Sequence, residues 1–223
     1  MSTTISPKIS SGQSFLLHGM SWDFYEHLLK ELGDGPIRVT YDRGALELMS
    51  PSYRHEGHSQ ILGLMVRVLA EELEIPIKGA GSTTFRRESV ERGLEPDECF
   101  YIAHVSDILG KEELDLEIDP PPDLAIEVDV THRSIDRIPI YAALGIPELW
   151  RFDGTQILVY HRQPSGEYAE PQTQSLIFPT IPLSGLVEFL PRFIETDDAT
   201  FFREFRTWVK QYTTNDNKGS LES

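Results

Sequence analysis

The sequence has a single cysteine, Cys99, and no apolar run long enough to cross a membrane. One cysteine excludes an internal disulfide and a cysteine-rich zinc site. A membrane span needs about 18 apolar residues in a row, and the first residues, MSTTISPKISSGQSF, lack the basic start and apolar centre of a signal peptide. We therefore expect a cytoplasmic protein that does not associate with a membrane.

Basic residues are also scarce. The chain has 20 Lys and Arg against 36 Asp and Glu, which gives a formal net charge of −16. This balance argues against a protein that coats nucleic acid through a large basic surface. It does not exclude an enzyme that binds nucleic acid through a local basic rim, because carboxylates that hold a divalent cation themselves add negative charge.

The length of 223 residues suits one domain, or at most two small ones. No internal repeat or low-complexity segment interrupts the apolar pattern. We expect residues 1–13 to be flexible, residues 14–212 to form a single domain, and the polar residues 213–223 to be a disordered tail.

The apolar periodicity predicts a mixture of helices and strands. Helices are predicted over 22–32 (with Ser21 as the N-cap), 54–74, 134–144 and 198–212. Strands are predicted for a hairpin over 37–41 and 45–49, and over 77–86, 97–102, 124–130, 148–152 and 156–161, with one or two more in 168–190. Strands mixed with flanking helices favour an α/β or α+β fold with a mixed central sheet.

The predicted strand 124–130 carries two carboxylates on one face. Alternate residues of a strand share a face, which puts Glu127 and Asp129 about 7 Å apart. Neighbouring like charges are tolerated when they are solvated, paired with a base or bridged by a cation. The preceding strand begins with Pro96-Asp97. Asp97 and Glu127 on adjacent strands would supply the oxygen ligands that a hard cation such as Mg²⁺ takes. A solvated strand face is the alternative interpretation.

These residues resemble the PD-(D/E)XK nuclease superfamily, which includes many restriction endonucleases. The run Pro122–Val128 (PDLAIEV), followed by Ile140–Trp150 (IYAALGIPELW), is similar to a restriction endonuclease family that is greatly expanded in cyanobacteria. The upstream run Leu46–Ser52 (LELMSPS) and the pair His55-Glu56 also resemble that family's N-terminal signature. The resemblance covers about residues 20–190.

The resemblance implies a restriction-endonuclease-like core, in which a mixed central sheet is flanked by helices. It implies that Asp97 and Glu127 hold Mg²⁺ or Mn²⁺, and that Glu56 contributes from the first core helix with His55 beside it. We also expect Asp129 and His55 as accessory residues of the site. Glu56 is equally explained as an acidic residue in the first turn of its own helix. The implied activity is endonucleolytic hydrolysis of DNA by a metal-activated water, and the implied assembly is a homodimer.

The sequence departs from the superfamily pattern at the lysine. The motif normally has lysine two residues after the glutamate, where this chain has Asp129. In the restriction endonuclease family that this sequence resembles, the lysine is displaced to a position four residues before Tyr141. In this chain that position is Arg137. Arginine can bind a phosphate but cannot act as a base at neutral pH. Two other interpretations therefore stay open: a catalytically degraded nuclease-fold protein that acts as a binding or regulatory module, and a metal-dependent hydrolase of another phosphate ester.

Overall fold

The computed structural model describes residues 12–33, 35–81, 83–130 and 134–213. Apart from residues 12, 13 and 213, the predicted flexible segment 1–13 and tail 213–223 lie outside this range. The helices are α1 (Trp22–Leu32), α2 (Tyr53–Glu72), α3 (Val105–Ile108), α4 (Ile138–Leu144), α5 (Leu183–Glu195) and α6 (Asp198–Thr213), with a 3-10 turn at Glu88–Val90. No helix of the described residues is long and apolar enough to span a membrane.

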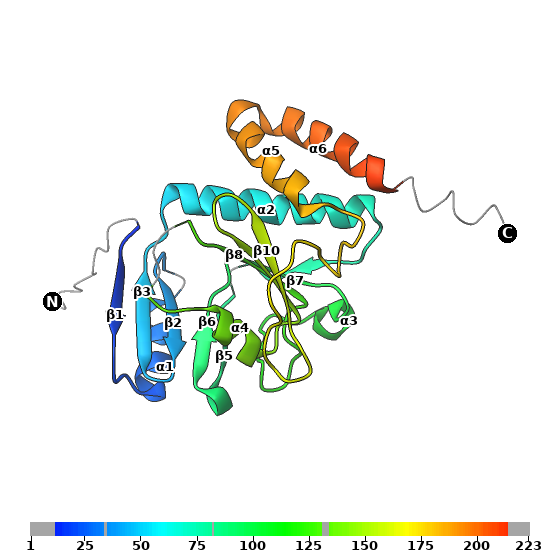
Figure 1. Cartoon of the computed structure of the whole chain (residues 1–223). Coiled ribbons are helices and arrows are strands. Elements are labelled where there is room, and N and C mark those ends of the chain that lie inside the picture. Colours follow the sequence, from blue (N-terminus) through cyan, green and yellow to red (C-terminus); the bar gives the residue numbers. More distant parts are fainter. Residues whose placement is uncertain (1–11, 34, 82, 131–133, 214–223) are drawn as a thin grey trace.

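The strands form two five-stranded sheets (Figure 1). The first sheet has the order β1-β3-β2-β6-β5, and every pair in it is antiparallel. Its strands are β1 (Ser14–Leu17), β2 (Arg38–Asp42), β3 (Ala45–Met49), β5 (Phe85–Arg87) and β6 (Arg92–Leu94). The second sheet has the order β10-β9-β8-β7-β4. Its strands are β4 (Lys78–Gly79), β7 (Glu98–Tyr101), β8 (Leu124–Val128), β9 (Glu148–Phe152) and β10 (Ile157–His161).

The first sheet contains the predicted hairpin and packs on the first predicted helix. The hairpin turns through Arg43 and Gly44, whose φ angles of 45° and 93° suit a two-residue turn. Helix α1 begins at its predicted cap, because the Ser21 side chain accepts the backbone N–H of Phe24 at 3.2 Å. A small apolar core around Tyr25 joins this helix to strands β2 and β3.

The second sheet is mixed, as predicted. Strands β8 and β9 are parallel, and the remaining pairs are antiparallel. A parallel pair needs a crossover connection, and α4 lies in that connection. The alternation of β8 decides what covers each face: Ile126 and Val128 pack in the main core with α2, whereas Ala125 packs in a second core with residues of α4. Glu127 therefore faces α4 rather than α2.

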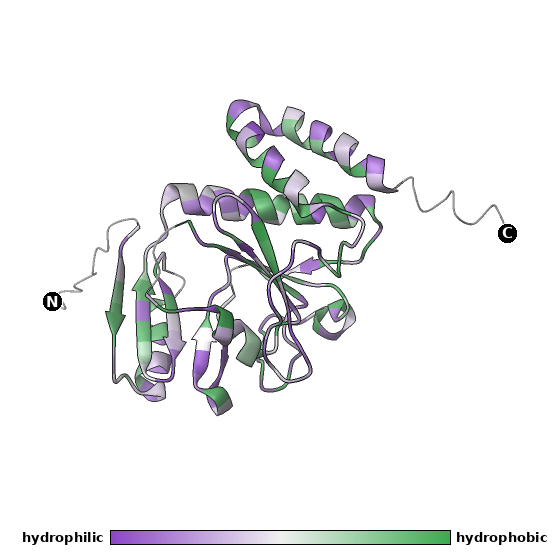
Figure 2. Cartoon of the chain, viewed as in Figure 1, coloured by the Kyte–Doolittle hydropathy of each residue, from purple (hydrophilic) through white to green (hydrophobic). Residues whose placement is uncertain are grey.

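The C-terminal helices α5 and α6 lie along the outer side of α2 (Figure 1). They contribute Leu186, Phe189, Phe201 and Phe205 to the main core, together with apolar residues of α2. Figure 2 shows hydrophobic residues along the middle of α2 and on the central strands beneath it. Helix α2 is thus packed between the second sheet on one side and α5 and α6 on the other.

Two predicted elements differ from the structure in their bounds. The predicted strand 77–86 is divided between the two sheets, because β4 pairs with β7 while β5 pairs with β6. Gly81, with φ 58°, lies in the turn between them. The helix predicted over 134–144 begins only at Ile138, where Pro139 suits the first turn.

The prediction of strands over 168–190 is wrong. Residues 168–172 contain two isolated bridges, and α5 begins at Leu183. Leu183, Leu186 and Leu190 repeat at the helical spacing and are buried. Pro182 is the N-cap of this helix, and Pro191 is tolerated inside it.

The packing of α5 on α6 makes a testable prediction at Gly185. A Cβ added there would overlap the ring of Trp208 on α6. We expect Gly185→Ala to lower the free energy of unfolding by about 1–2 kcal/mol in urea denaturation. The matched control is Gly57→Ala in α2, where an added Cβ has no neighbour within 4 Å, so that stability should stay equal or rise. Equal stability of both variants would mean that the two helices do not pack at Gly185.

Candidate active site

Asp97 and Glu127 face each other across the antiparallel strands β7 and β8. Glu98 pairs with Ile126, so the next step along the register puts Asp97 opposite Glu127. Directly opposite residues of an antiparallel pair project to the same face. Asp97 Oδ2 accepts the backbone N–H of Val128 at 2.6 Å, which holds the carboxylate against β8. Both acids are almost completely buried, at 3% and 4% exposed.

Asp97 lies in a group of charged side chains centred on Arg38 of β2. The Arg38 guanidinium donates to Asp97 Oδ1 and, at 2.8 Å, to Glu56 Oε1. Glu95 Oε1 lies 3.8 Å from Arg38 Nε, and His55 Nε2 lies 3.2 Å from Asp97 Oδ2. Burial lowers the pKa of Arg38, but the charges of Asp97 and Glu56 outweigh this effect and raise it. Arg38 is therefore a permanent cation within the acidic group.

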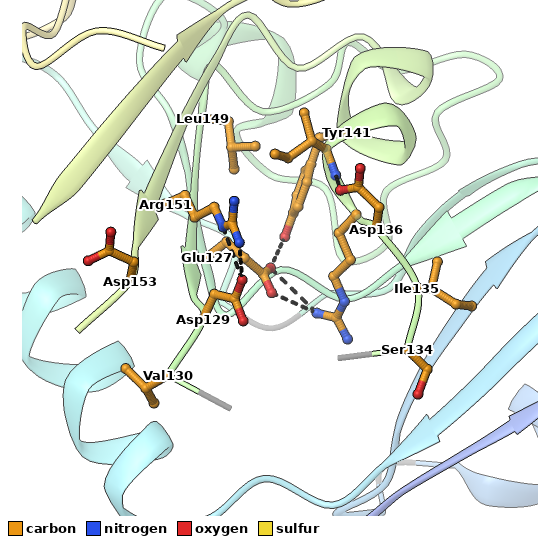
Figure 3. A pocket seen from close by; sticks show the side chains of 12 residues that line it. Glu127, Asp129, Val130, Ser134, Ile135, Asp136, Tyr141, Leu149, Arg151 and Asp153 are labelled. Atoms are coloured by element: carbon orange, nitrogen blue, oxygen red, sulfur yellow. Dashed lines mark hydrogen bonds and ion pairs between the residues drawn. The ribbon is translucent and has the colours of Figure 1, made fainter. Parts of the chain in front are cut away.

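Glu127 is held by two residues of the α4 region. Arg137, the N-cap residue of α4, places Nη1 3.1 Å from Oε1 and 3.4 Å from Oε2 of Glu127. The Tyr141 hydroxyl donates to Glu127 Oε2 at 2.5 Å. Burial and the charge of Glu127 hold the pKa of Tyr141 well above its usual value, so that the hydroxyl stays protonated. Glu127 is thus an oriented, charge-compensated carboxylate (Figure 3).

A pocket of about 690 Å³ opens beside Glu127. Asp129 and Arg151 also line it, and Arg151 donates to Asp129 Oδ2 through Nη2 and, at 3.0 Å, through Nε. Figure 3 shows Tyr141 directed towards Glu127 and Arg151 directed towards Asp129. Asp129, the predicted accessory acid, thus lines the same pocket as Glu127 but is paired with a different arginine.

The predicted site residues other than Asp129 form one electrostatic group. His55 and Glu56, on the first turn of α2, meet Asp97 around Arg38. Arg137 meets Glu127. The cluster around Arg38 and the pair of Arg137 with Glu127 also interact electrostatically. The charge of Asp97 contributes to raising the pKa of Arg137, and the charge of Glu127 contributes to raising the pKa of Arg38.

The pair Asp97 and Glu127 has the chemistry of a Mg²⁺ site. Mg²⁺ is usually bound through one or two carboxylates, with water and substrate phosphate completing its shell. Within the described ranges, no group of three or more His, Cys, Asp or Glu side chains is arranged to hold a metal ion. Guanidinium groups lie on both carboxylates instead. The acids therefore fit a two-carboxylate site, in which an ion would share them with Arg38 and Arg137.

Sequence reasoning missed three residues of this site. No sequence pattern indicated a role for Arg38, because it belongs to the first sheet and reaches the site only through the packing of the two sheets. Tyr141 lay in an apolar pattern that indicates a core residue. Glu47 of β3 is 1% exposed, and its Oε1 accepts the backbone N–H of Ser134 at 2.8 Å. Its place in the run LELMSPS was the only hint of a role near the site.

The mixed sheet with its opposed acids defines a restriction-endonuclease-like protein of the PD-(D/E)XK superfamily. The model of the Uma2 family, described as "Putative restriction endonuclease", matches residues 22–187. The chain belongs to this family. The predictions of the superfamily and of the fold class are thereby confirmed.

The fold is also found in a solved structure. The "crystal structure of a putative nuclease belonging to DUF820 from Anabaena variabilis ATCC 29413" matches with a TM-score of 0.53 and 14% sequence identity. The alignment covers 77% of this chain and 99% of that chain. A comparison with curated proteins finds no match.

Proposed function

We propose that the protein is a metal-dependent endonuclease that hydrolyses phosphodiester bonds in DNA. The observation that carries the proposal is the placement of Asp97 opposite Glu127 on adjacent strands, with Glu127 lining an open pocket. Membership of a family described as "Putative restriction endonuclease" supports it, and so does the description of the solved structure as "a putative nuclease".

Four residues of the site have a defined role in this proposal. Asp97 and Glu127 would hold Mg²⁺ or Mn²⁺, which would supply an activated water and neutralise charge on the phosphate. Tyr141 and Arg137 orient Glu127 through the hydrogen bonds described above. Arg137 also brings positive charge to the pocket for a phosphate, but it does not act as a base, because its guanidinium stays protonated at neutral pH.

The direct test is nicking of supercoiled plasmid by the purified chain. We expect conversion to open circles in Mg²⁺ or Mn²⁺ and none in EDTA. The same preparation should leave bis(p-nitrophenyl) phosphate untouched if DNA rather than a small phosphate ester is the substrate. Rapid ester hydrolysis without nicking would favour the third interpretation, a hydrolase of another phosphate ester. A homodimer and a cytoplasmic location remain predictions, and sedimentation at equilibrium tests the first of them.

A non-catalytic binding module is the second candidate function. It is favoured by Arg137, which stands at the position of the expected lysine and lies on Glu127. A lysine there would contact Glu127 through a single ammonium group and leave more of the carboxylate open. We expect Arg137→Lys to raise the nicking rate by about tenfold, which corresponds to an activation free energy lower by about 1.4 kcal/mol. Absence of nicking by both the unmodified chain and Arg137→Lys, with DNA retained in a gel-shift assay, would support the binding module.

A further inference from the structure

Arg38 reaches the site from a different sheet than Asp97. It lies on β2 of the first sheet, whereas Asp97 immediately precedes β7 of the second. Its side chain is 9% exposed. Nη1 donates to Asp97, Nη2 donates to Glu56 at 2.8 Å, and Nε lies 3.8 Å from Glu95. All three nitrogens of the guanidinium therefore face carboxylates.

The guanidinium stands beside Asp97 where a metal ion would bind the same acid. A guanidinium in a protein is never deprotonated, so its charge is permanent. The three carboxylates around it belong to α2 and to the segment Glu95–Asp97. Asp97 is the buried member of the three. A buried carboxylate requires a compensating cation, and Arg38 supplies one from within the chain.

We infer that Arg38 is an internal counter-ion that competes with the divalent metal for Asp97. Its presence keeps the acidic group stable before the metal binds, and it lowers the affinity of the site for the metal. The inference rests on the proposed function only in taking the ion at Asp97 to be the metal of the nuclease.

The contacts of Asp97 distinguish competition from positioning. Asp97 Oδ2 is fixed without Arg38, by the backbone N–H of Val128 at 2.6 Å and by His55 Nε2 at 3.2 Å. Arg38 donates to the other oxygen, Oδ1. Loss of the guanidinium therefore leaves the carboxylate oriented. It also removes a positive charge that repels any cation bound to the same acid.

The test is calorimetric titration of Mn²⁺ into the full chain and into Arg38→Gln. Glutamine can donate to Asp97 but carries no charge. We expect Arg38→Gln to bind Mn²⁺ at least about tenfold more tightly than the unmodified chain. Arg38→Lys, which keeps the charge, should bind within about threefold of the unmodified chain. The matched control is Arg43→Gln, since Arg43 lies in the same hairpin but is 63% exposed and bonds to Asp42; its Mn²⁺ affinity should not change.

Thermal unfolding gives a second measurement. Without metal, Arg38→Gln should unfold at a lower temperature than the unmodified chain, and Mn²⁺ should raise its unfolding temperature by more. If the variant is unfolded without metal, Mn²⁺ should refold it, and failure to refold would overturn the inference. Equal or weaker Mn²⁺ binding by Arg38→Gln than by the unmodified chain would also overturn the inference. So would tight Mn²⁺ binding that persists in the double variant Arg38→Gln/Asp97→Asn.

The inference and the proposed function fail in different ways. Tighter Mn²⁺ binding by Arg38→Gln that depends on Asp97, with no DNA cleavage by any variant, supports the counter-ion and contradicts the nuclease. Metal-dependent nicking by the unmodified chain, with no gain in affinity in Arg38→Gln, contradicts the counter-ion and supports the nuclease.

Discussion

Glu127→Gln is expected to lower the rate of plasmid nicking by more than about a hundredfold. Glutamine keeps the shape of the side chain and can still accept the hydrogen bond from Tyr141. It loses the negative charge that a hard cation requires from its ligand. The loss should appear in the cleavage rate at saturating DNA, because the substitution acts on the reacting centre rather than on the binding surface. Single-turnover nicking of supercoiled plasmid measures it.

The control for this prediction is Glu117→Gln, an acid that is exposed and lies in the segment between β7 and β8. It should cleave at the unmodified rate. Circular dichroism should show both variants folded. Nicking that survives Glu127→Gln at full rate would locate the activity at another site or in a contaminating nuclease, and would remove Glu127 from the mechanism.

Arg137→Met is expected to lower the free energy of unfolding by about 3–5 kcal/mol. The side chains of Arg137 and Glu127 are 3% and 5% exposed, so the substitution leaves a buried carboxylate without its cation. Methionine retains much of the side-chain volume, which limits the loss from packing. Urea denaturation at pH 7 measures the effect.

Arg151→Met is the matched control, because it breaks a pair beside the same pocket. The side chains of Arg151 and Asp129 are 34% and 20% exposed. A pair this open to solvent contributes at most about 1 kcal/mol. Equal losses in the two variants would show that burial of the Arg137 pair does not set its strength.

The acidic pair could be predicted from the sequence because its signals are local. Strand alternation assigns Glu127 to the face opposite Ile126 without any knowledge of the fold. The resemblance then points to Asp97 as its partner. The register that brings the two acids opposite each other depends on pairing between strands that are about 30 residues apart, and periodicity alone does not specify it.

Arg38 could not be predicted in this way. It is 59 residues from Asp97 in the sequence, and the two residues meet only because the first sheet packs beside the second. In a hairpin strand, an arginine is ordinarily a solvent-exposed residue. The same reason explains the wrong prediction of a single strand over residues 77–86. The chain passes there from one sheet to the other, and local propensity does not predict a change of sheet.

The most direct test of the account is a crystal structure of the chain soaked in Mn²⁺, with anomalous diffraction used to locate the ion. We expect one anomalous peak between Asp97 and Glu127, about 2.0–2.6 Å from a carboxylate oxygen of each. A peak that contacts neither acid, in crystals of a protein that nicks plasmid in Mn²⁺, would contradict it.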